Sequence, residues 1–224
     1  GTGYVQLIDF ADLQRLAKQH NCTISLAIRT GDFVHRDLTL LQVIGADPSE
    51  FADAARKAFT LGPTRTPEQD PQFLIDELVE IGLRALSPGI NDPFTAITAL
   101  HWLGAATAEI GRRDLRKDVC NGDEDECAVI PCPDDFVHYA DRGFGSIRSG
   151  VATSAAASEV MLETLRNAAT PIKHAGRRKV LRLEAELLME QARLALEGPD
   201  LKKVEHRFRE FAQAVPSNRL REAS

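Results

Sequence analysis

The chain contains few of the residues that mark several common protein classes. Its 224 residues include 4 Cys, 1 Trp, 2 Tyr and 2 Met. Four cysteines are too few for a disulfide scaffold of this length, and they are typical of a reducing compartment. The N-terminus shows no basic start, apolar segment and cleavage site, so no signal peptide is expected. These absences exclude the small disulfide-rich secreted proteins.

Long apolar runs and an excess of positive charge are also missing. The longest uncharged run, from Pro93 to Ala108, contains His101 and many Ala, Thr and Gly residues. It falls short of the roughly 20 strongly apolar residues that a membrane-spanning helix needs. The formal net charge is −6, and phosphate contacts need a basic surface. We therefore expect no nucleic-acid partner.

Residues 1–46 are expected to form a small β-rich subdomain. Alternating apolar residues between Cys22 and Ile28 have the period of a strand. Further short strands are predicted at Tyr4–Ile8, Phe33–Val34 and Leu38–Ile44. Asp9 is typical of the N-cap of a short helix that would follow the first strand.

Residues 47–216 are expected to form a mainly α domain, a bundle of about five to seven helices. The first helix is predicted to begin after Asp47 and to end at Leu61–Pro63. The segment Asn121–Pro133 is expected to be a loop, and residues 217–224 a disordered tail. The predicted fold class is therefore mainly α with a small β-rich, barrel-like N-terminal subdomain.

The segment "ALSPGINDPF", Ala85–Phe94, is explained as a tight connection between two helices. Pro88 disfavours a helical conformation for the residue before it. Gly89 is expected to adopt the positive φ that ends a helix. Asp92 and Pro93 are typical of an N-cap and a first helical residue.

This connection leaves Asn91 and Arg84 without a role, although an i,i+4 ion pair with Glu80 would account for Arg84. Polar side chains from this hairpin and the preceding segment could converge on a small pocket that binds an anion or acts as an acid–base site. The alternative is a buried polar network that fixes the hairpin. The candidate pocket comprises Arg65, Asp70, Arg84, Ser87, Asn91, Asp92 and His101. No residue is assigned a catalytic role.

Several segments resemble one bacterial family. The combination of "RALSPGINDPFTA" with "RTPEQDPQFLIDELVEIGL", preceded by "GYVQLID" and "RTGDFV", is similar to the predicted membrane proteins known as domain of unknown function 2254. The resemblance covers Gly3–Leu103 well and is looser through "FGSIRSG". It identifies the chain as the soluble C-terminal domain of such a protein.

The resemblance implies a place in the cell but no reaction. Family members carry transmembrane helices before this region, which implies a domain on the cytoplasmic side of the bacterial inner membrane. The leading interpretation is a non-catalytic, homo-oligomeric domain for assembly, ligand sensing or gating, without a cofactor. The alternative is a hydrolase-like or transferase-like enzyme with a polar site at residues 84–92.

A second resemblance concerns residues 27–45. The segment "AIRTGDFVHRDLTLLQVIG" is similar to the hammerhead barrels of biotinyl and lipoyl carriers, in which a Gly-Asp turn places short strands back to back. The candidate hairpin tips carry no lysine, so we expect a barrel-like structural module and no carrier function.

Two further clusters leave alternatives open. Cys120, Cys127 and Cys132 could be free thiols, a disulfide or part of a metal site, but their spacing lacks the usual Cys-x₂₋₄-Cys pair and fourth ligand of zinc, and no metal is predicted. A basic cluster near the start of a predicted helix would suit anionic lipid headgroups, or be a solvated helix start. Its members are Lys173, Arg177, Arg178 and Lys179.

Overall fold

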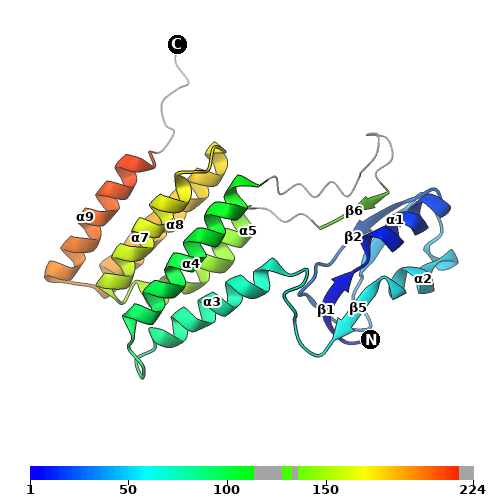
Figure 1. The fold of residues 1–224 in the computed structure, drawn as a ribbon, viewed down its shortest axis with the longest axis horizontal. Coiled ribbons are helices and arrows are strands. Elements are labelled where there is room, and N and C mark those ends of the chain that lie inside the picture. The colour runs from blue at the N-terminus through cyan, green and yellow to red at the C-terminus, as the bar shows by residue number, and fades with distance from the viewer. Residues whose placement is uncertain (114–127, 133–135, 217–224) are drawn as a thin grey trace, which may run out of the picture. The chain divides into compact units, whose positions relative to one another are not determined.

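The computed structural model describes residues 1–113, 128–132 and 136–216 (Figure 1). Its contacts divide the chain into two compact units. The first unit comprises Gly1–Leu74 with Arg116–Asp134, and the second comprises Ile75–Leu115 with Asp135–Ser224. The boundary expected near residue 46 falls inside the first unit in this division, and residues 217–224 lie outside the described residues. The chain is mostly helical with small N-terminal sheets, as predicted.

The first sheet is built around the N-terminal strand. Strand β1 (Gly3–Ile8) lies between β3 (Phe33–Val34) and β5 (Phe59–Gly62) and is antiparallel to both. The sequence predicted β1 and β3, but it placed residues 59–62 in a helix. That prediction was wrong because the helix stops at Lys57 and the following residues pair with β1, a contact between segments far apart in the sequence.

The second sheet is built around β2 (Thr23–Leu26), which pairs antiparallel with β4 (Leu41–Ile44) and parallel with β6 (Val129–Ile130). The segment Asn121–Pro133, expected to be a loop, therefore contributes a strand. A two-residue strand carries too little periodicity to be recognised without its partner. The two sheets are separate and do not close into a barrel, so the barrel-like arrangement is corrected.

Two short helices complete the first unit. Helix α1 (Phe10–Gln19) begins where the Asp9 side chain accepts a hydrogen bond from the Asp12 backbone N–H, the cap that the sequence predicted. A 3₁₀ turn (Pro48–Glu50) precedes α2 (Ala52–Lys57). The core of this unit contains apolar side chains from the strands and from α1, led by Val5, Leu13, Ala17, Ile24 and Val34.

The second unit is a helical body. Its helices include two adjacent pairs, α3–α4 and α8–α9, connected by short turns (Figure 1). The helices are α3 (Pro71–Ala85), α4 (Pro93–Arg112), α5 (Phe136–Ala140), α6 (Ser146–Val151), α7 (Ala155–Ala169), α8 (Ala175–Ala195) and α9 (Gly198–Ala214). Between α5 and α6 the chain forms a π-helical segment, Asp141–Gly145, which the sequence did not predict.

Small residues allow α4 to pack closely against α7 and the residues that follow it. A Cβ atom added at Gly104 would lie 2.1 Å from Cγ2 of Thr164 on α7. A Cβ atom added at Gly111 would lie 2.3 Å from Cδ1 of Ile172. Both glycines are therefore needed because a neighbouring side chain occupies the space that any other residue would fill. Leu100, Leu103, Met161 and other buried residues of this unit form its apolar core.

Candidate functional site

The α3–α4 connection is a tight turn, and the structure assigns a backbone role to Asn91. Asn91 has a φ of 50°, whereas Gly89 does not have the positive φ predicted for it. The Asn91 backbone N–H donates to the carbonyl oxygen of Ser87 at 2.9 Å, and that of Asp92 donates to Ala85 at 2.8 Å. Asparagine tolerates the left-handed conformation better than most residues. The turn therefore places its left-handed residue two positions later than expected.

Asp92 caps α4 as predicted. Its Oδ1 accepts hydrogen bonds from the backbone N–H groups of Phe94, at 3.1 Å, and Thr95, at 3.2 Å. Its Oδ2 accepts a hydrogen bond from the Thr95 hydroxyl at 2.5 Å. The Thr95 hydroxyl, followed by the backbone N–H groups, lowers the pKa of Asp92 because each hydrogen bond favours the carboxylate. These bonds explain the residue as the start of a helix.

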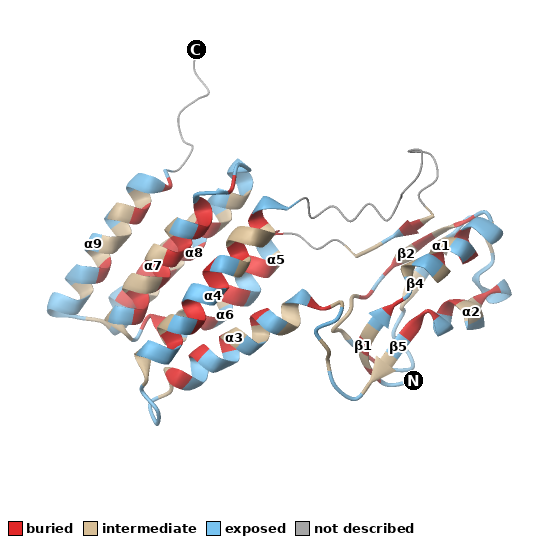
Figure 2. Cartoon of the chain, viewed as in Figure 1, coloured by how far each residue is buried: buried red, intermediate tan, exposed pale blue. Residues whose placement is uncertain are grey.

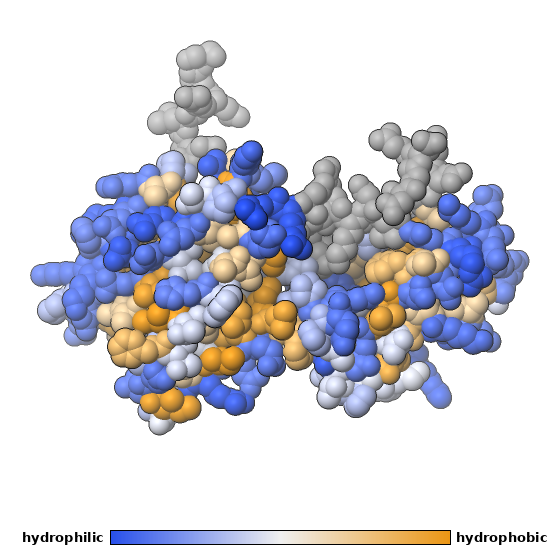
Figure 3. Space-filling model, in the orientation of Figure 1, coloured by the Kyte–Doolittle hydropathy of each residue, from blue (hydrophilic) through white to orange (hydrophobic). Residues whose placement is uncertain are grey.

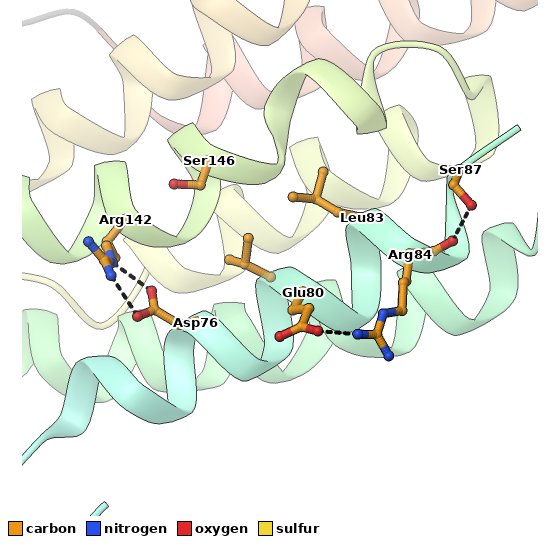
Figure 4. Close-up of a pocket in the computed structure, with 8 residues that line it drawn as sticks. Asp76, Glu80, Leu83, Arg84, Ser87, Arg142 and Ser146 are labelled. Carbon is orange, nitrogen blue, oxygen red and sulfur yellow. Dashed lines mark hydrogen bonds and ion pairs between the residues drawn. The ribbon is translucent and has the colours of Figure 1, made fainter. Parts of the chain in front are cut away.

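A groove of about 570 Å³ runs beside α3 (Figure 4). Two candidate pocket residues, Arg84 and Ser87, line it. The Arg84 guanidinium pairs with Glu80 one turn earlier, as the spacing predicted, and the Ser87 hydroxyl donates to the Arg84 carbonyl oxygen at 2.7 Å. The complete lining consists of Asp76, Val79, Glu80, Leu83, Arg84, Ser87, Arg142 and Ser146.

The opposite wall of the groove was missed by sequence reasoning. Arg142, on the π-helical segment, donates two hydrogen bonds to the Asp76 carboxylate, at 2.6 and 2.7 Å. The two residues lie far apart in the sequence, so only the folded chain brings them together. π-Helical segments are frequent at functional sites. The two arginines and two acidic residues of the groove form internal ion pairs, and the groove therefore carries no net charge.

Arg65 and Asp70 form a buried ion pair in the first unit. Asp70 is 2% exposed and accepts hydrogen bonds from Arg65 Nε, at 2.7 Å, and Nη2, at 2.6 Å. It also accepts the backbone N–H of Phe73 in the first turn of α3. Gly31 has a φ of 90°, and a Cβ atom there would lie 2.2 Å from Asp70 Oδ2. The ion pair therefore lies between the turn at Gly31 and the first turn of α3.

The seven residues of the candidate pocket thus belong to different units. Arg65 and Asp70 lie in the first, whereas Arg84, Ser87, Asn91, Asp92 and His101 lie in the second. Within the second unit, Arg84 and Ser87 line the groove, Asn91 and Asp92 build the turn, and His101 is exposed on α4. A single pocket that unites all seven stays a prediction.

A second buried ion pair lies in the helical body. Arg148 on α6 donates to the carboxylate of Glu184 on α8, which is 4% exposed. Burial raises the pKa of Glu184, and the nearby Arg148 partly opposes that shift. The pair connects two helices and does not line the groove beside α3.

The exposed side of α4 has an unusual composition. A surface helix normally presents charged and polar residues to solvent. The exposed residues of α4 before its last turn carry no formal charge, and they are Phe94, Thr95, Thr98, His101, Trp102 and Ala105. Phe94 is 78% exposed and Trp102 is 64% exposed. Ile81 on α3 and Ile90 in the turn add two more exposed apolar side chains to the same hairpin.

We call this surface the α4 face: Ile81, Ile90 and the uncharged exposed residues of α4. Hydrophobic side chains gather over the α3–α4 part of the helical body in Figure 3. The sequence contained the signal, since the uncharged run Pro93–Ala108 was visible. Periodicity alone did not show that one side of this run faces solvent.

The remaining candidate clusters have structural contacts or lie outside the described residues. Cys22 is buried, which raises the pKa of its thiol, and the Cys132 thiol donates to the carbonyl oxygen of Leu26. Cys120 and Cys127 are outside the described residues. In the basic cluster, Arg177 donates to the carbonyl oxygens of Gly111 and Arg113. No group of three or more His, Cys, Asp and Glu residues suited to a metal occurs in the described part of the chain.

Comparison with known sequences places the chain in a family of predicted membrane proteins. The family model described as "Predicted membrane protein (DUF2254)" matches residues 1–167, and the chain belongs to this family. It is similar to the uncharacterised proteins Mb1321c of Mycobacterium bovis and Rv1290c of Mycobacterium tuberculosis, each 34% identical over 154 residues.

These matches cover unequal shares of the proteins compared. They span 66% of this chain but only 29% of each mycobacterial protein. No solved structure matches the chain significantly. Among the described residues, none of the helices has both the length and the apolar character needed to cross a bilayer. The family description supports an association with membranes.

Proposed function

We propose that this chain is an assembly domain of a bacterial inner-membrane protein, and that it acts through the α4 face. One observation carries the proposal: the exposed side of α4 presents large apolar residues and no formal charge before its last turn. Exposed apolar surfaces of this kind mark protein–protein or membrane interaction sites. The family, described as a predicted membrane protein, supplies the membrane context.

We place the domain on the cytoplasmic side. The small number of cysteines supports this orientation, because a reducing compartment does not retain disulfides. The exposed basic residues Lys173, Arg178 and Lys179 would face anionic lipid headgroups in this arrangement. Ligand sensing and gating are further roles of the same kind, but the α4 face favours assembly.

The hairpin residues also bear on the alternative of an enzyme with a site at residues 84–92. Arg84 pairs with Glu80, the Ser87 hydroxyl donates to a backbone carbonyl, and the Asp92 carboxylate caps α4. Each of these contacts stabilises the hairpin itself. They do not supply the hydrogen bond between a nucleophile and a base that covalent catalysis requires. The contacts therefore favour the assembly domain.

The proposal is tested with the product of the complete gene in bacterial membranes. Phe94→Glu introduces a charge at a side chain that is 78% exposed, so the fold of the helical body should be preserved. We expect the native complex, extracted in mild detergent and sized by native electrophoresis, to become smaller. His206→Glu, at an exposed residue of α9, is the matched control and should leave the complex unchanged. An unchanged size for the Phe94 variant would refute the assembly function.

A further inference from the structure

The outermost residues of α4 have the spacing of a helix–helix seam. They recur at alternating intervals of four and three residues, the period with which two long helices pack against each other. These residues are the exposed Phe94, Thr98, His101, Ala105 and Arg112, together with Ala108, which is half-buried and also packs against the apolar core. The buried residues of α4, such as Leu100, Leu103 and Thr107, lie on the other side of the helix. The helix therefore has a second stripe suited to packing, which the described residues leave exposed or half-buried.

The seam begins with a large apolar side chain, and its apolar residues toward the other end are small. Phe94 is large and lies near the turn, whereas Ala105 and Ala108 are small and lie toward the other end of the helix. A parallel pairing of two such helices would place Phe94 against Phe94 and leave the alanines facing each other across a gap. An antiparallel pairing centred on His101 places each Phe94 against Ala108 of the partner and each Thr98 within one residue of Ala105. The large Phe94 then meets a small residue at both ends of the pairing, as close packing requires.

The charges at the two ends of α4 also favour the antiparallel pairing. At the C-terminal end of α4, Arg112 and Arg113 share a single carboxylate, that of Glu109, at 2.5 and 3.0 Å. At the other end, Asp92 carries a carboxylate with a lowered pKa. An antiparallel pairing brings the end with excess positive charge beside the Asp92 end of its partner. It also opposes the two helix dipoles.

We infer that a second copy of this chain covers the α4 face, through an antiparallel pairing of two α4 helices about a two-fold axis at His101. This inference rests on the proposed assembly function and adds the identity and geometry of the partner. Because a two-fold interface uses the same patch on both copies, each residue of the seam contributes twice. Ile81 and Trp102 flank the seam on the α3 side.

The first experiment measures the mass of the 224-residue chain by sedimentation velocity over a range of concentrations. The unaltered chain should form a dimer. Phe94→Glu should weaken the dimer at least about tenfold, since each copy loses an apolar contact and buries a charge twice. His206→Glu should change the dissociation constant by less than about twofold. Circular dichroism checks that both variants keep their helical content.

The second experiment tests the geometry by disulfide trapping. His101→Cys is made in a background with Cys120→Ser, Cys127→Ser and Cys132→Ser, in which the buried Cys22 is kept. Two cysteines on the proposed axis should bridge on mild oxidation, because their Cβ atoms approach to within the roughly 4 Å that a disulfide spans. His206→Cys in the same background is the control and should remain unbridged.

The outcomes separate this inference from the function on which it rests. If the complex in membranes shrinks with Phe94→Glu but His101→Cys does not bridge, the face binds another partner and the two-fold pairing is overturned, while the assembly function stands. If the chain is a monomer that sediments with vesicles of phosphatidylcholine and phosphatidylglycerol, and Phe94→Glu abolishes this, the face binds lipid and the second copy is again overturned. A dimer that bridges through His101→Cys supports both.

Discussion

Helices α4 and α9 belong to the same helical body but divide their residues in opposite ways. Helix α9 buries few side chains, chiefly Val204 and Phe211, and presents charged residues such as Lys202, Lys203 and Arg209 to solvent. Helix α4 buries seven residues, several of them small, and its exposed side is uncharged until its last turn. Exposed and half-buried residues prevail along α9 in Figure 2, whereas buried residues recur along α4.

The different composition of their exposed sides separates an ordinary surface helix, α9, from a helix whose exposed side is also suited to packing, α4. The composition of α9 is what a surface helix needs, because its charged side faces water and a few large side chains attach it to the body. Helix α4 has packing residues on both sides, although only one side packs within the described chain. The contrast is the reason why we propose the assembly function for α4 and not for the more accessible α9.

The attachment of α9 by a few large residues can be broken by a single truncation. Phe211 is 1% exposed, and Phe211→Ala should lower the free energy of unfolding by about 3–5 kcal/mol because it leaves a cavity. Hydrogen exchange should show lost protection along α9 before α4 is affected. Phe208→Ala, at a half-buried neighbour, is the control with a smaller expected loss. Equal loss of protection in both helices would show that α9 is not attached separately.

The close approach of α4 to α7 can be broken by adding one methyl group. A Cβ atom at Gly104 would lie 2.1 Å from Thr164 Cγ2, so Gly104→Ala should cost about 1–3 kcal/mol of unfolding free energy through overpacking. Gly89 has no atom within 4 Å of an added Cβ and no positive φ, so Gly89→Ala is the matched control. It should be neutral or slightly stabilising. Chemical denaturation of the two variants gives the comparison.

Local signals mark the start of both helices in the sequence. Helix α9 begins with Gly198 and Pro199, and α4 begins with Pro93 directly after the Asp92 cap. The predictions failed where distant segments decide the structure. Residues 59–62 form a strand only because β1 offers a partner, and Arg142 meets Asp76 only in the folded chain.

In the candidate site, too, the sequence predicted only the contacts between residues close together in the chain. The i,i+4 pair of Arg84 with Glu80 and the Asp92 cap are local, and both were predicted correctly. The positive φ was placed at Gly89 instead of Asn91, because the hydrogen bonds that close the turn determine its register. The exposed uncharged face of α4 depends on which side of the helix the rest of the body covers, and a single sequence does not contain that information.

The start of α4 is fixed by a cap that α9 lacks. The Asp92 side chain accepts hydrogen bonds at the N-terminus of α4, whereas Glu197 makes no such bond at the start of α9. Asp92→Ala should therefore destabilise the fold, by less than the two core variants, and Glu197→Ala should have little effect. Because the pKa of Asp92 is lowered in the folded state, its contribution is present above the unfolded pKa and is lost as pH falls through the folded value. Thermal unfolding of both variants between acid and neutral pH measures this difference.

The smallest effect on folding should come from giving α4 a charge of the kind that α9 already has. Ala105 is exposed, so Ala105→Lys should change the free energy of unfolding by no more than about 0.5 kcal/mol. The same substitution should nevertheless abolish association, because it places a lysine in the middle of the seam on both copies. Ala214→Lys, at the exposed alanine that ends α9, should alter neither property. If Ala105→Lys unfolds the domain, the outer side of α4 is part of the folded core. If it leaves both stability and association intact, the contrast between α4 and α9 has no functional meaning.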